Sequence, residues 1–488
     1  MIGRRVVFIL ASAAALSACA VAHHRAPDLT LPAAYEAPAG SQKLSSHQLD
    51  DWWLFFSDPE LNRLEQQAFT FSPDAKTAAA RLLEARSTMQ AATSATLPTG
   101  SITGNVSRQS EMNLLSSSDQ LLPIGGVTET QQLNFNVSWE LDFFGRLRTE
   151  RRIAKADFAA SRFDIAAAWA SLAANVATDY FQAKGLAIQL DDAQTNADIS
   201  AHLYDIAKRK ADLGLGAATD ADRAAGDLAL AKAQAVDLGA QLHAAKRQLL
   251  ILVGRGIEPV TSVSATAEVP DPPPVPVAIP GALLTRRPDI EEARAKLSAE
   301  VGQQVLKHLA VFPTFTLLPG LGLTRQVAPG VGFIPPATIF AQQQTTALGF
   351  WSLAVGVNQP VLNIPQLLQE AKAEDARTEE AVIAYEKTVQ TAYGEAEDDL
   401  DGMSSDRKRL AILEDGEARA HRAYDAAETL YREGFDDLTT ALSAEENWRN
   451  TRSALTSARV AALQRAVQTY KALGGGWGFA AAGTRPSS

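Results

Sequence analysis

The chain's single cysteine, Cys19, stands at the end of the segment Leu16-Ser17-Ala18-Cys19. A cysteine preceded by small residues resembles the motif at which a signal peptide is cleaved ahead of a lipid-modified cysteine. Arg4 and Arg5 supply the basic start of such a segment, and the apolar stretch 6–16 is too short to remain as a transmembrane helix. A lone exported thiol has no internal disulfide partner. We therefore predict acylation of Cys19; the alternative is an ordinary signal peptide with an incidental cysteine.

No other residues have the spacing of a catalytic or metal centre. His23 and His24 are adjacent but lack further ligand-type neighbours, so we interpret them as a solvated pair. The sequence contains no H-E-x-x-H, Walker-type or G-x-S-x-G motif, and Gly474–Gly476 lacks the strand-then-helix setting of a phosphate loop. The net charge of -11 argues against a nucleic-acid partner. We expect no enzyme activity, no metal and no cofactor beyond a covalent lipid on Cys19.

Four stretches of the chain alternate between apolar and polar residues. In residues 133–142 every second side chain is apolar, which predicts a strand with one apolar and one polar face. The strands are predicted at about 99–108, 129–142, 312–325 and 348–363. Residues 109–128 and 327–347, rich in Gly, Ser, Pro or Gln, are predicted to be long loops.

Long helices are predicted after each pair of strands. Residues 144–212 contain no proline, and small or apolar residues from Leu186 to Ala211 recur at a 4-3-4-3 spacing typical of close helix packing. Glycines at 214 and 216 would end this helix before a second one at about 219–253. The second half repeats the order, with helices predicted at 288–310, 366–432 and 437–473. The shared order of elements indicates an internal duplication.

These elements divide the chain into six predicted segments. They are a signal peptide (1–18), a lipid-anchored extended leader (19–50), a first repeat (51–253), a proline-rich connector (254–287), a second repeat (288–477) and a flexible tail (478–488). The aromatic cluster of Trp52, Trp53, Phe55 and Phe56 is expected to pack a core rather than bind a ligand.

Strands with one apolar face favour a membrane barrel. A strand crosses a bilayer in about 9 to 11 residues and must belong to a closed barrel, because open edges leave backbone groups unsatisfied in lipid. Known barrels have about 8 strands or more, so a chain with four must oligomerise to close one. The polar helices would then extend into the periplasm. The alternative is a soluble sheet with one buried face.

Several short motifs occur in order along almost the whole chain. They are Trp52-Trp53 with Phe56, Asp58-Pro59 and Leu61-Asn62; Ser138–Asp142 with Phe144–Arg148; Arg286–Ile290; Phe312-Pro313; Tyr431-Arg432 with Gly434; and Tyr470–Trp477. With the motif at Cys19 they make the chain resemble the TolC-like outer-membrane channels of tripartite efflux pumps, and among them the lipidated OprM/NodT-type subfamily.

The resemblance implies a mainly α-helical homotrimer whose protomers each give four strands to a twelve-stranded membrane barrel and long helices to a periplasmic tunnel. It implies a passive exit duct for small molecules in the outer membrane. Its implied partners are a periplasmic adaptor and an inner-membrane pump, often of the RND class. The alternatives are a duct for type I protein secretion or for metal efflux, and a lipid-anchored coiled-coil protein that does not span the membrane.

The resemblance also implies a gate at the periplasmic tip, where the Gly turns lie. Where the subfamily commonly has a leucine and an aspartate, this chain has Thr439 and Ser443. The acids nearby are Asp436, Asp437 and Glu445, and three copies of an acid would form a ring that attracts cations. Alternatively, Asp436 and Asp437 only begin the last helix. We expect a gate that is looser, or held differently, than is usual in the subfamily.

Overall fold

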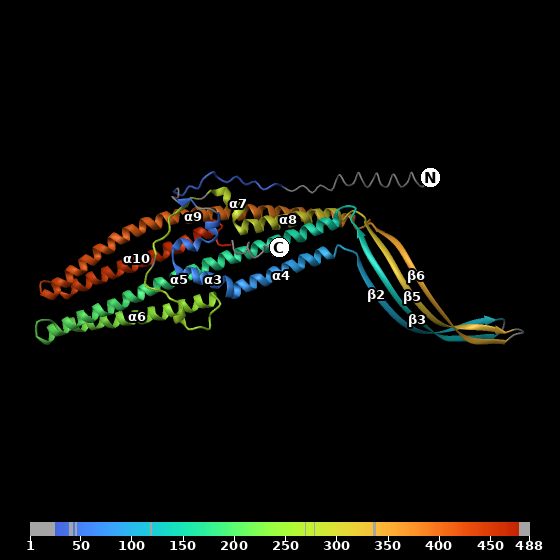
Figure 1. Cartoon of the computed structure of the whole chain (residues 1–488), viewed down its shortest axis with the longest axis horizontal. Coiled ribbons are helices and arrows are strands. Elements are labelled where there is room, and N and C mark those ends of the chain that lie inside the picture. Colours follow the sequence, from blue (N-terminus) through green and yellow to red (C-terminus); the bar gives the residue numbers. More distant parts are fainter. Residues whose placement is uncertain are drawn as a thin grey trace. The chain divides into compact units, whose positions relative to one another are not determined.

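The structure is a computed structural model that describes residues 25–38, 42–43, 46–117, 120–268, 270–277, 279–334 and 338–477 (Figure 1). The predicted signal peptide, Cys19, His23, His24 and the tail from 478 lie outside these residues. Two compact units are present: one contains Arg25 with residues 86–158 and 297–381, and the other contains residues 26–85, 159–296 and 382–477. No helix among the described residues is both long and apolar enough to cross a membrane.

The two halves of the chain contain matching elements. The first half contains α3 (Pro59–Phe71), α4 (Pro73–Ser94), β2 (Thr99–Ser117), β3 (Gln120–Leu141), α5 (Arg146–Asp212) and α6 (Ala218–Leu252). The second contains α8 (Pro288–Leu309), β5 (Thr314–Ile334), β6 (Thr338–Asn358), α9 (Ile364–Glu433) and α10 (Leu438–Ala472). Helices α5 and α9 have 67 and 70 residues, and α6 and α10 have 35 each. The predicted duplication is therefore present.

Short elements join the two halves and precede them. They are β1 (Gln42–Lys43), α2 (Ser46–Asp50), the 3-10 helix η1 (Trp52–Phe56), η2 (Val260–Ser262), β4 (Pro276–Val277), η3 (Pro280–Ala282) and α7 (Leu283–Arg286). Strand β1 of the leader pairs in parallel with β4 of the connector. The proline-rich connector thus contains regular structure over part of its length.

The four long strands form one antiparallel sheet in the order β2-β3-β5-β6. They are longer than predicted, so the interpretation of residues 109–128 and 327–347 as long loops was wrong. Strands β2 and β3 are separated only by residues 118–119, and β5 and β6 only by residues 335–337. The ladder of backbone hydrogen bonds continues beyond the alternating stretches, where the sequence has lost its apolar period. Strand β6 ends at Asn358, five residues before the predicted end, because α9 begins at Ile364.

Glycines end the long helices at the turn between α5 and α6 and at the turn between α9 and α10. Gly214 and Gly434 have φ angles of 71° and 86°, a left-handed conformation that glycine adopts without strain. After each glycine a backbone N–H closes the turn: Leu215 donates to the Lys210 carbonyl, and Phe435 to the Leu430 carbonyl. Both breaks were predicted from the glycines.

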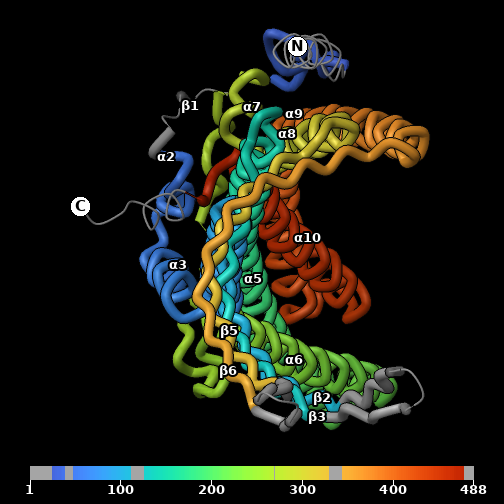
Figure 2. Tube along the Cα trace, turned by 90° about the vertical axis from the view of Figure 1, so that its right-hand side faces the viewer, coloured from blue at the N-terminus to red at the C-terminus, as the bar shows by residue number. Residues whose placement is uncertain are grey.

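The aromatic cluster lies in the main core of the helical unit, as predicted. Trp52, Trp53 and Phe56 are almost fully buried, together with side chains of α3, α5 and α10. Figure 2 traces the backbones of these three helices. The Trp52 ring stacks on Tyr470 with a centroid separation of 6.1 Å, and Phe56 contacts Phe181 at 4.9 Å. Trp477 donates to the carbonyls of Arg286 and Gly474, so the segment after α10 is docked onto α7.

Candidate functional site

The sheet has one apolar and one polar face, and the strand register shows which residues share each face. One row of paired residues contains Ile102, Phe135, Leu321 and Trp351. The next row contains Ser101, Asn136, Gly320 and Ser352. Adjacent rows point to opposite faces of a sheet. Trp351 is 76% exposed and Ile102 71%, so nothing within the described chain covers the apolar face.

The apolar face has the height of a bilayer core. Along β3 it extends from Leu133 to Leu141, nine residues that rise about 27–30 Å when extended. A hydrocarbon core is about 30 Å thick. Beyond Leu133 on the same face the rows contain Arg108, Glu129 and Arg325. The sheet therefore presents a band of membrane height that ends in charged residues.

Three large apolar residues, Leu318, Leu348 and Phe350, interrupt the polar face, and the sequence analysis did not single them out. Phe350 belongs to the row of Thr103, Asn134 and Gly322, and Leu348 belongs to the next polar row. The Phe350 ring lies against Gly322, where an added Cβ would be 2.2 Å from the ring. Gly322 thus makes room for an aromatic ring that remains about half exposed on the polar face.

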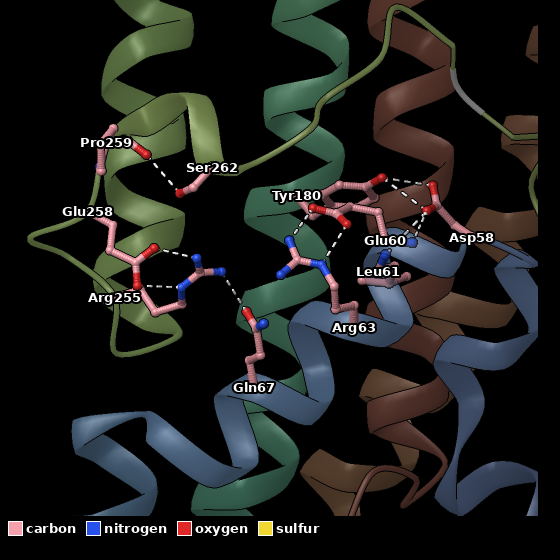
Figure 3. Close-up of polar contacts among 10 residues, drawn as sticks. All are labelled: Asp58, Glu60, Leu61, Arg63, Gln67, Tyr180, Arg255, Glu258, Pro259 and Ser262. Carbon is pink, nitrogen blue, oxygen red and sulfur yellow. Dashed lines mark hydrogen bonds and ion pairs between the residues drawn. The ribbon is translucent and has the colours of Figure 1, made fainter.

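Asp58 links the start of α3 to α5 in the helical unit (Figure 3). Its carboxylate accepts hydrogen bonds from the Leu61 N–H at 3.2 Å and the Tyr180 hydroxyl at 2.9 Å, and it pairs with the Lys184 ammonium at 2.9 Å. Burial raises the pKa of Asp58, but Lys184 and the other donors outweigh this effect, so its pKa lies below the usual value. The carboxylate that caps α3 is therefore also half of a buried ion pair.

Two further ion pairs stiffen the same region. Arg63 pairs with Glu60 on α3, and Arg255 pairs with Glu258 while also donating to Gln67 at 3.1 Å (Figure 3). Of these contacts, the Arg255–Gln67 hydrogen bond ties α3 to the segment that follows α6. Each of the two arginines is neutralised by a glutamate three residues away, so we interpret these contacts as structural.

Arg287 holds the beginning of the second repeat. A helix was predicted from residue 288, and α8 does begin at Pro288. The Arg287 side chain is also buried, pairs with Glu395 of α9 at 2.7 Å and donates to the Ala472 carbonyl at the end of α10 at 3.2 Å. Its partners lie 108 and 185 residues away, which sequence spacing alone does not reveal.

The predicted gate residues lie at the start of α10. Asp437 caps α10 and accepts from the Thr440 N–H at 2.8 Å, and the Asp436 carboxylate accepts from the Asp437 N–H. Hydrogen bonds from Thr440 hold the pKa of Asp437 below its usual value. The capping role that we considered for these acids is thus present. Thr439 accepts from Arg223 of α6 at 3.4 Å.

The other two predicted gate residues point in different directions from α10. Ser443 is exposed, one turn along from Thr439, whereas Glu445 is 5% exposed and lies 3.7 Å from Arg449. Burial raises the pKa of Glu445, and Arg449 opposes this shift. Glu446 is exposed and continues the stripe of Thr439 and Ser443 at helical spacing. The carboxylate on this stripe is therefore Glu446, which the sequence analysis did not name.

A polar layer joins α5 to α10 next to Glu445. Arg452 pairs with Asp192 at 2.5 Å, and Asn196 of α5 is in place to bridge Glu445 and Arg449. A small cavity of about 90 Å³ lies beside these groups. Within the described residues no cluster of three or more His, Cys, Asp or Glu side chains is arranged to hold a metal ion.

Comparison with known proteins identifies the family to which the chain belongs. The family described as "Outer membrane efflux protein" matches residues 64–255 and 279–475. The chain belongs to this family. The match covers both repeats, and the resemblance inferred from the motifs is confirmed. The chain is therefore an outer membrane efflux channel, the exit duct of an efflux system.

Curated relatives and solved structures agree with this membership. The pyoverdine export outer membrane protein OpmQ of Pseudomonas aeruginosa is 27% identical over 430 residues, covering 87% of each chain. The toluene efflux pump outer membrane protein TtgC of Pseudomonas putida is 28% identical over 87% of this chain and 85% of its own. The outer-membrane channel OprN shares the fold, with a TM-score of 0.78 and 24% identity over 94% of this chain and all of that chain.

Proposed function

We propose that three copies of this chain close a twelve-stranded barrel. The observation that carries the proposal is the pairing of the sheet, in which β2 and β6 each have one neighbour. Open edges are costly in lipid, and four strands are fewer than any known membrane barrel contains. Pairing β6 of one protomer with β2 of the next is antiparallel and satisfies both edges. A periplasmic adaptor and an inner-membrane pump of the RND type would complete the system and supply its energy.

The cargo that we propose is a class of small, amphipathic organic molecules. OpmQ and TtgC are named for pyoverdine export and toluene efflux, whereas CusC of Escherichia coli, 23% identical over 95% of this chain and 97% of its own, is named for cation efflux. Phe350 supports the organic class, because an exposed aromatic ring beside Asn134 offers apolar and hydrogen-bonding contacts together.

Deletion of the gene in its own host tests the cargo. We expect an aromatic dye to accumulate in the deletion strain while tolerance to copper and silver is unchanged, and the wild-type chain should restore dye efflux. Complementation with Phe350→Ser should restore efflux less well for the dye than for a small hydrophilic antibiotic. Loss of metal tolerance with normal dye efflux would instead favour the metal duct.

We also propose that the exposed stripe of α10 forms the gate. It contains Thr439, Ser443 and Glu446 and lacks the aspartate expected at 443. Ser443→Asp should lower the single-channel conductance and slow vancomycin entry, because three added carboxylates would narrow the gate and bind cations. Asn450→Asp, two turns further along, is the matched control and should change neither. Unaltered conductance in Ser443→Asp would show that this stripe is not the constriction.

A further inference from the structure

The N-terminal leader lies along α9 and is held by glutamates of that helix (Figure 1). The Arg25 guanidinium pairs with Glu379 at 3.0 Å. The Asp28 backbone N–H donates to the Glu386 carboxylate at 2.8 Å. The leader therefore contacts successive turns of α9 in the order of its own sequence.

The contacts continue to the end of the leader. Glu397 accepts from the backbone N–H groups of Glu36 and Ala37, at 3.0 and 2.5 Å. Just before them, the Tyr35 ring stacks on Tyr393 with a centroid separation of 5.5 Å. Because three of the four glutamate contacts are made to backbone N–H groups, this surface binds an extended chain largely irrespective of its side chains.

The residues of α9 that hold the leader share one face. Glu379, Glu386, Tyr393 and Glu397 are separated by seven, seven and four residues, the spacing of a single helical stripe. We call these four residues the leader-binding stripe. The leader has a matching pattern of burial. Its residues Leu29, Leu31, Tyr35 and Ala37 are partly buried, whereas most residues between them are exposed. The two patterns define a docking surface.

The length of chain before Arg25 limits where a lipid on Cys19 can lie. Six residues from Cys19 to Arg25 extend at most about 20–22 Å. Along α9, Glu379 lies fifteen residues after Ile364, about 22 Å from the start of the helix and the base of the sheet. The two lengths are equal, so the spacer has to be almost fully extended for Cys19 to reach the base of the apolar band.

We propose that the leader-binding stripe of α9 is a docking surface for the chain's own leader that fixes the height at which the acyl chains on Cys19 enter the membrane. The proposal rests on the lipidation predicted at Cys19. When the leader is docked in this register, the segment between Cys19 and Arg25 has no spare length. A shorter spacer must pull the leader off the stripe, and a longer one leaves it in place.

Trypsin cleavage after Arg25, measured on the acylated full-length channel in outer-membrane lipid, reports the docking. Deletion of Ala22–His24 removes about 10 Å of reach, and we expect cleavage to become about tenfold faster, the change that loss of one charge-assisted hydrogen bond produces. Insertion of Gly-Ser-Gly after His24 is the matched control and should leave the rate unchanged. Equal rates for the deletion and the insertion would overturn the proposal.

The stripe is tested separately from the anchor. Glu386→Ala combined with Glu397→Ala should accelerate cleavage after Arg25, whereas Glu380→Ala, on the exposed side of α9, should not. Cleavage unaffected by the double substitution would show that the stripe does not hold the leader.

A chain that begins at Ala20 behind an ordinary cleavable signal peptide removes the anchor. In it the deletion of Ala22–His24 should have no effect, because nothing pulls on the leader; acceleration there would contradict the proposed link to the lipid. The mass of the peptide released by trypsin reports the lipid itself. A peptide without acyl chains would refute lipidation of Cys19, while the double substitution would still decide whether α9 binds the leader.

Discussion

The two repeats have the same elements and nearly the same lengths, but they differ in burial. Helix α10 of the second repeat buries sixteen side chains, whereas α6, of equal length, buries four. Leu230 and Val236 of α6 are 67% and 75% exposed. Duplication has therefore produced one hairpin that is packed within its own chain and one with an uncovered face. The uncovered hairpin is the one that neighbouring copies would have to cover.

The repeats also differ in how they begin. The first repeat has the 13-residue α3, which is held by the buried pair of Asp58 and Lys184. The second is preceded only by the four-residue α7 and is held by Arg287. The first repeat thus depends on a buried charge pair, and the second depends on one arginine with several acceptors.

Lys184→Met should have the largest effect on this comparison. It leaves the Asp58 carboxylate buried without its cation, so the free energy of unfolding should fall by about 3–5 kcal/mol. The thermal midpoint, followed by circular dichroism in detergent, measures the loss. Adding Asp58→Asn should recover part of it, and Lys208→Met on the exposed face of α5 is the control. A midpoint equal to that of the wild type would mean that the pair does not hold α3.

Glu65→Leu tests the loss of stability caused by a buried carboxyl group that belongs to the first repeat. Glu65 is fully buried in α3, neither carboxylate oxygen has a hydrogen-bond partner, and burial raises its pKa well above 4.5. Because the folded chain binds this proton more tightly, stability falls as pH rises above about 4.5, until the folded pKa is reached. Glu65→Leu should therefore stabilise the protein by about 2 kcal/mol at pH 7.5 and by less at pH 5. Melting curves at both pH values decide this, and a gain independent of pH would contradict it.

Gly214→Ala and Gly434→Ala compare the two tips directly. Both glycines have positive φ and nothing within 4 Å of an added Cβ, so each change should cost about 1–2 kcal/mol of backbone strain without a clash. Gly394→Ala, inside α9 with equal space, should stabilise by up to about 1 kcal/mol. Thermal midpoints of the three variants give the comparison. Clearly unequal costs at the two tips would show that the turns are not equivalent.

The smallest effect is expected from changing the N-cap residues of α6 and α10, the helices that follow these turns. Helix α10 has the Asp437 cap, whereas α6 begins at Ala217 without a side-chain cap. Ala217→Asp should stabilise α6 by about 0.5–1 kcal/mol, and Asp437→Ala should lower the thermal midpoint. The low pKa of Asp437 means that its contribution is present near neutral pH and is lost as pH falls below the unfolded value of about 3.8. An effect of Asp437→Ala that does not diminish at all as pH falls below 3.8 would argue against capping.

The sequence predicts most of the fold because its signals are local. Glycines at 214 and 434 mark the helix ends, and the alternation around Trp139 marks the membrane band. The outer parts of the strands escaped prediction because backbone pairing extends them without an apolar period. Arg287 escaped because Glu395 and the Ala472 carbonyl, which it binds in addition to the nearby Asp289, are distant in sequence. Glu65 carried a signal that was overlooked, since it falls on the apolar face of Leu61, Leu64 and Ala68 at helical spacing.

The native mass of the protein, extracted from outer membranes in mild detergent and corrected for bound detergent, tests the central claim most directly. A closed twelve-stranded barrel requires a mass of three chains, because each chain of 52.1 kDa before processing contributes four strands. We predict this mass, resistant to alkaline washing of the membrane. A monomer released by alkali or by removal of the lipid would contradict the account and leave Cys19 as the anchor of a periplasmic helical protein.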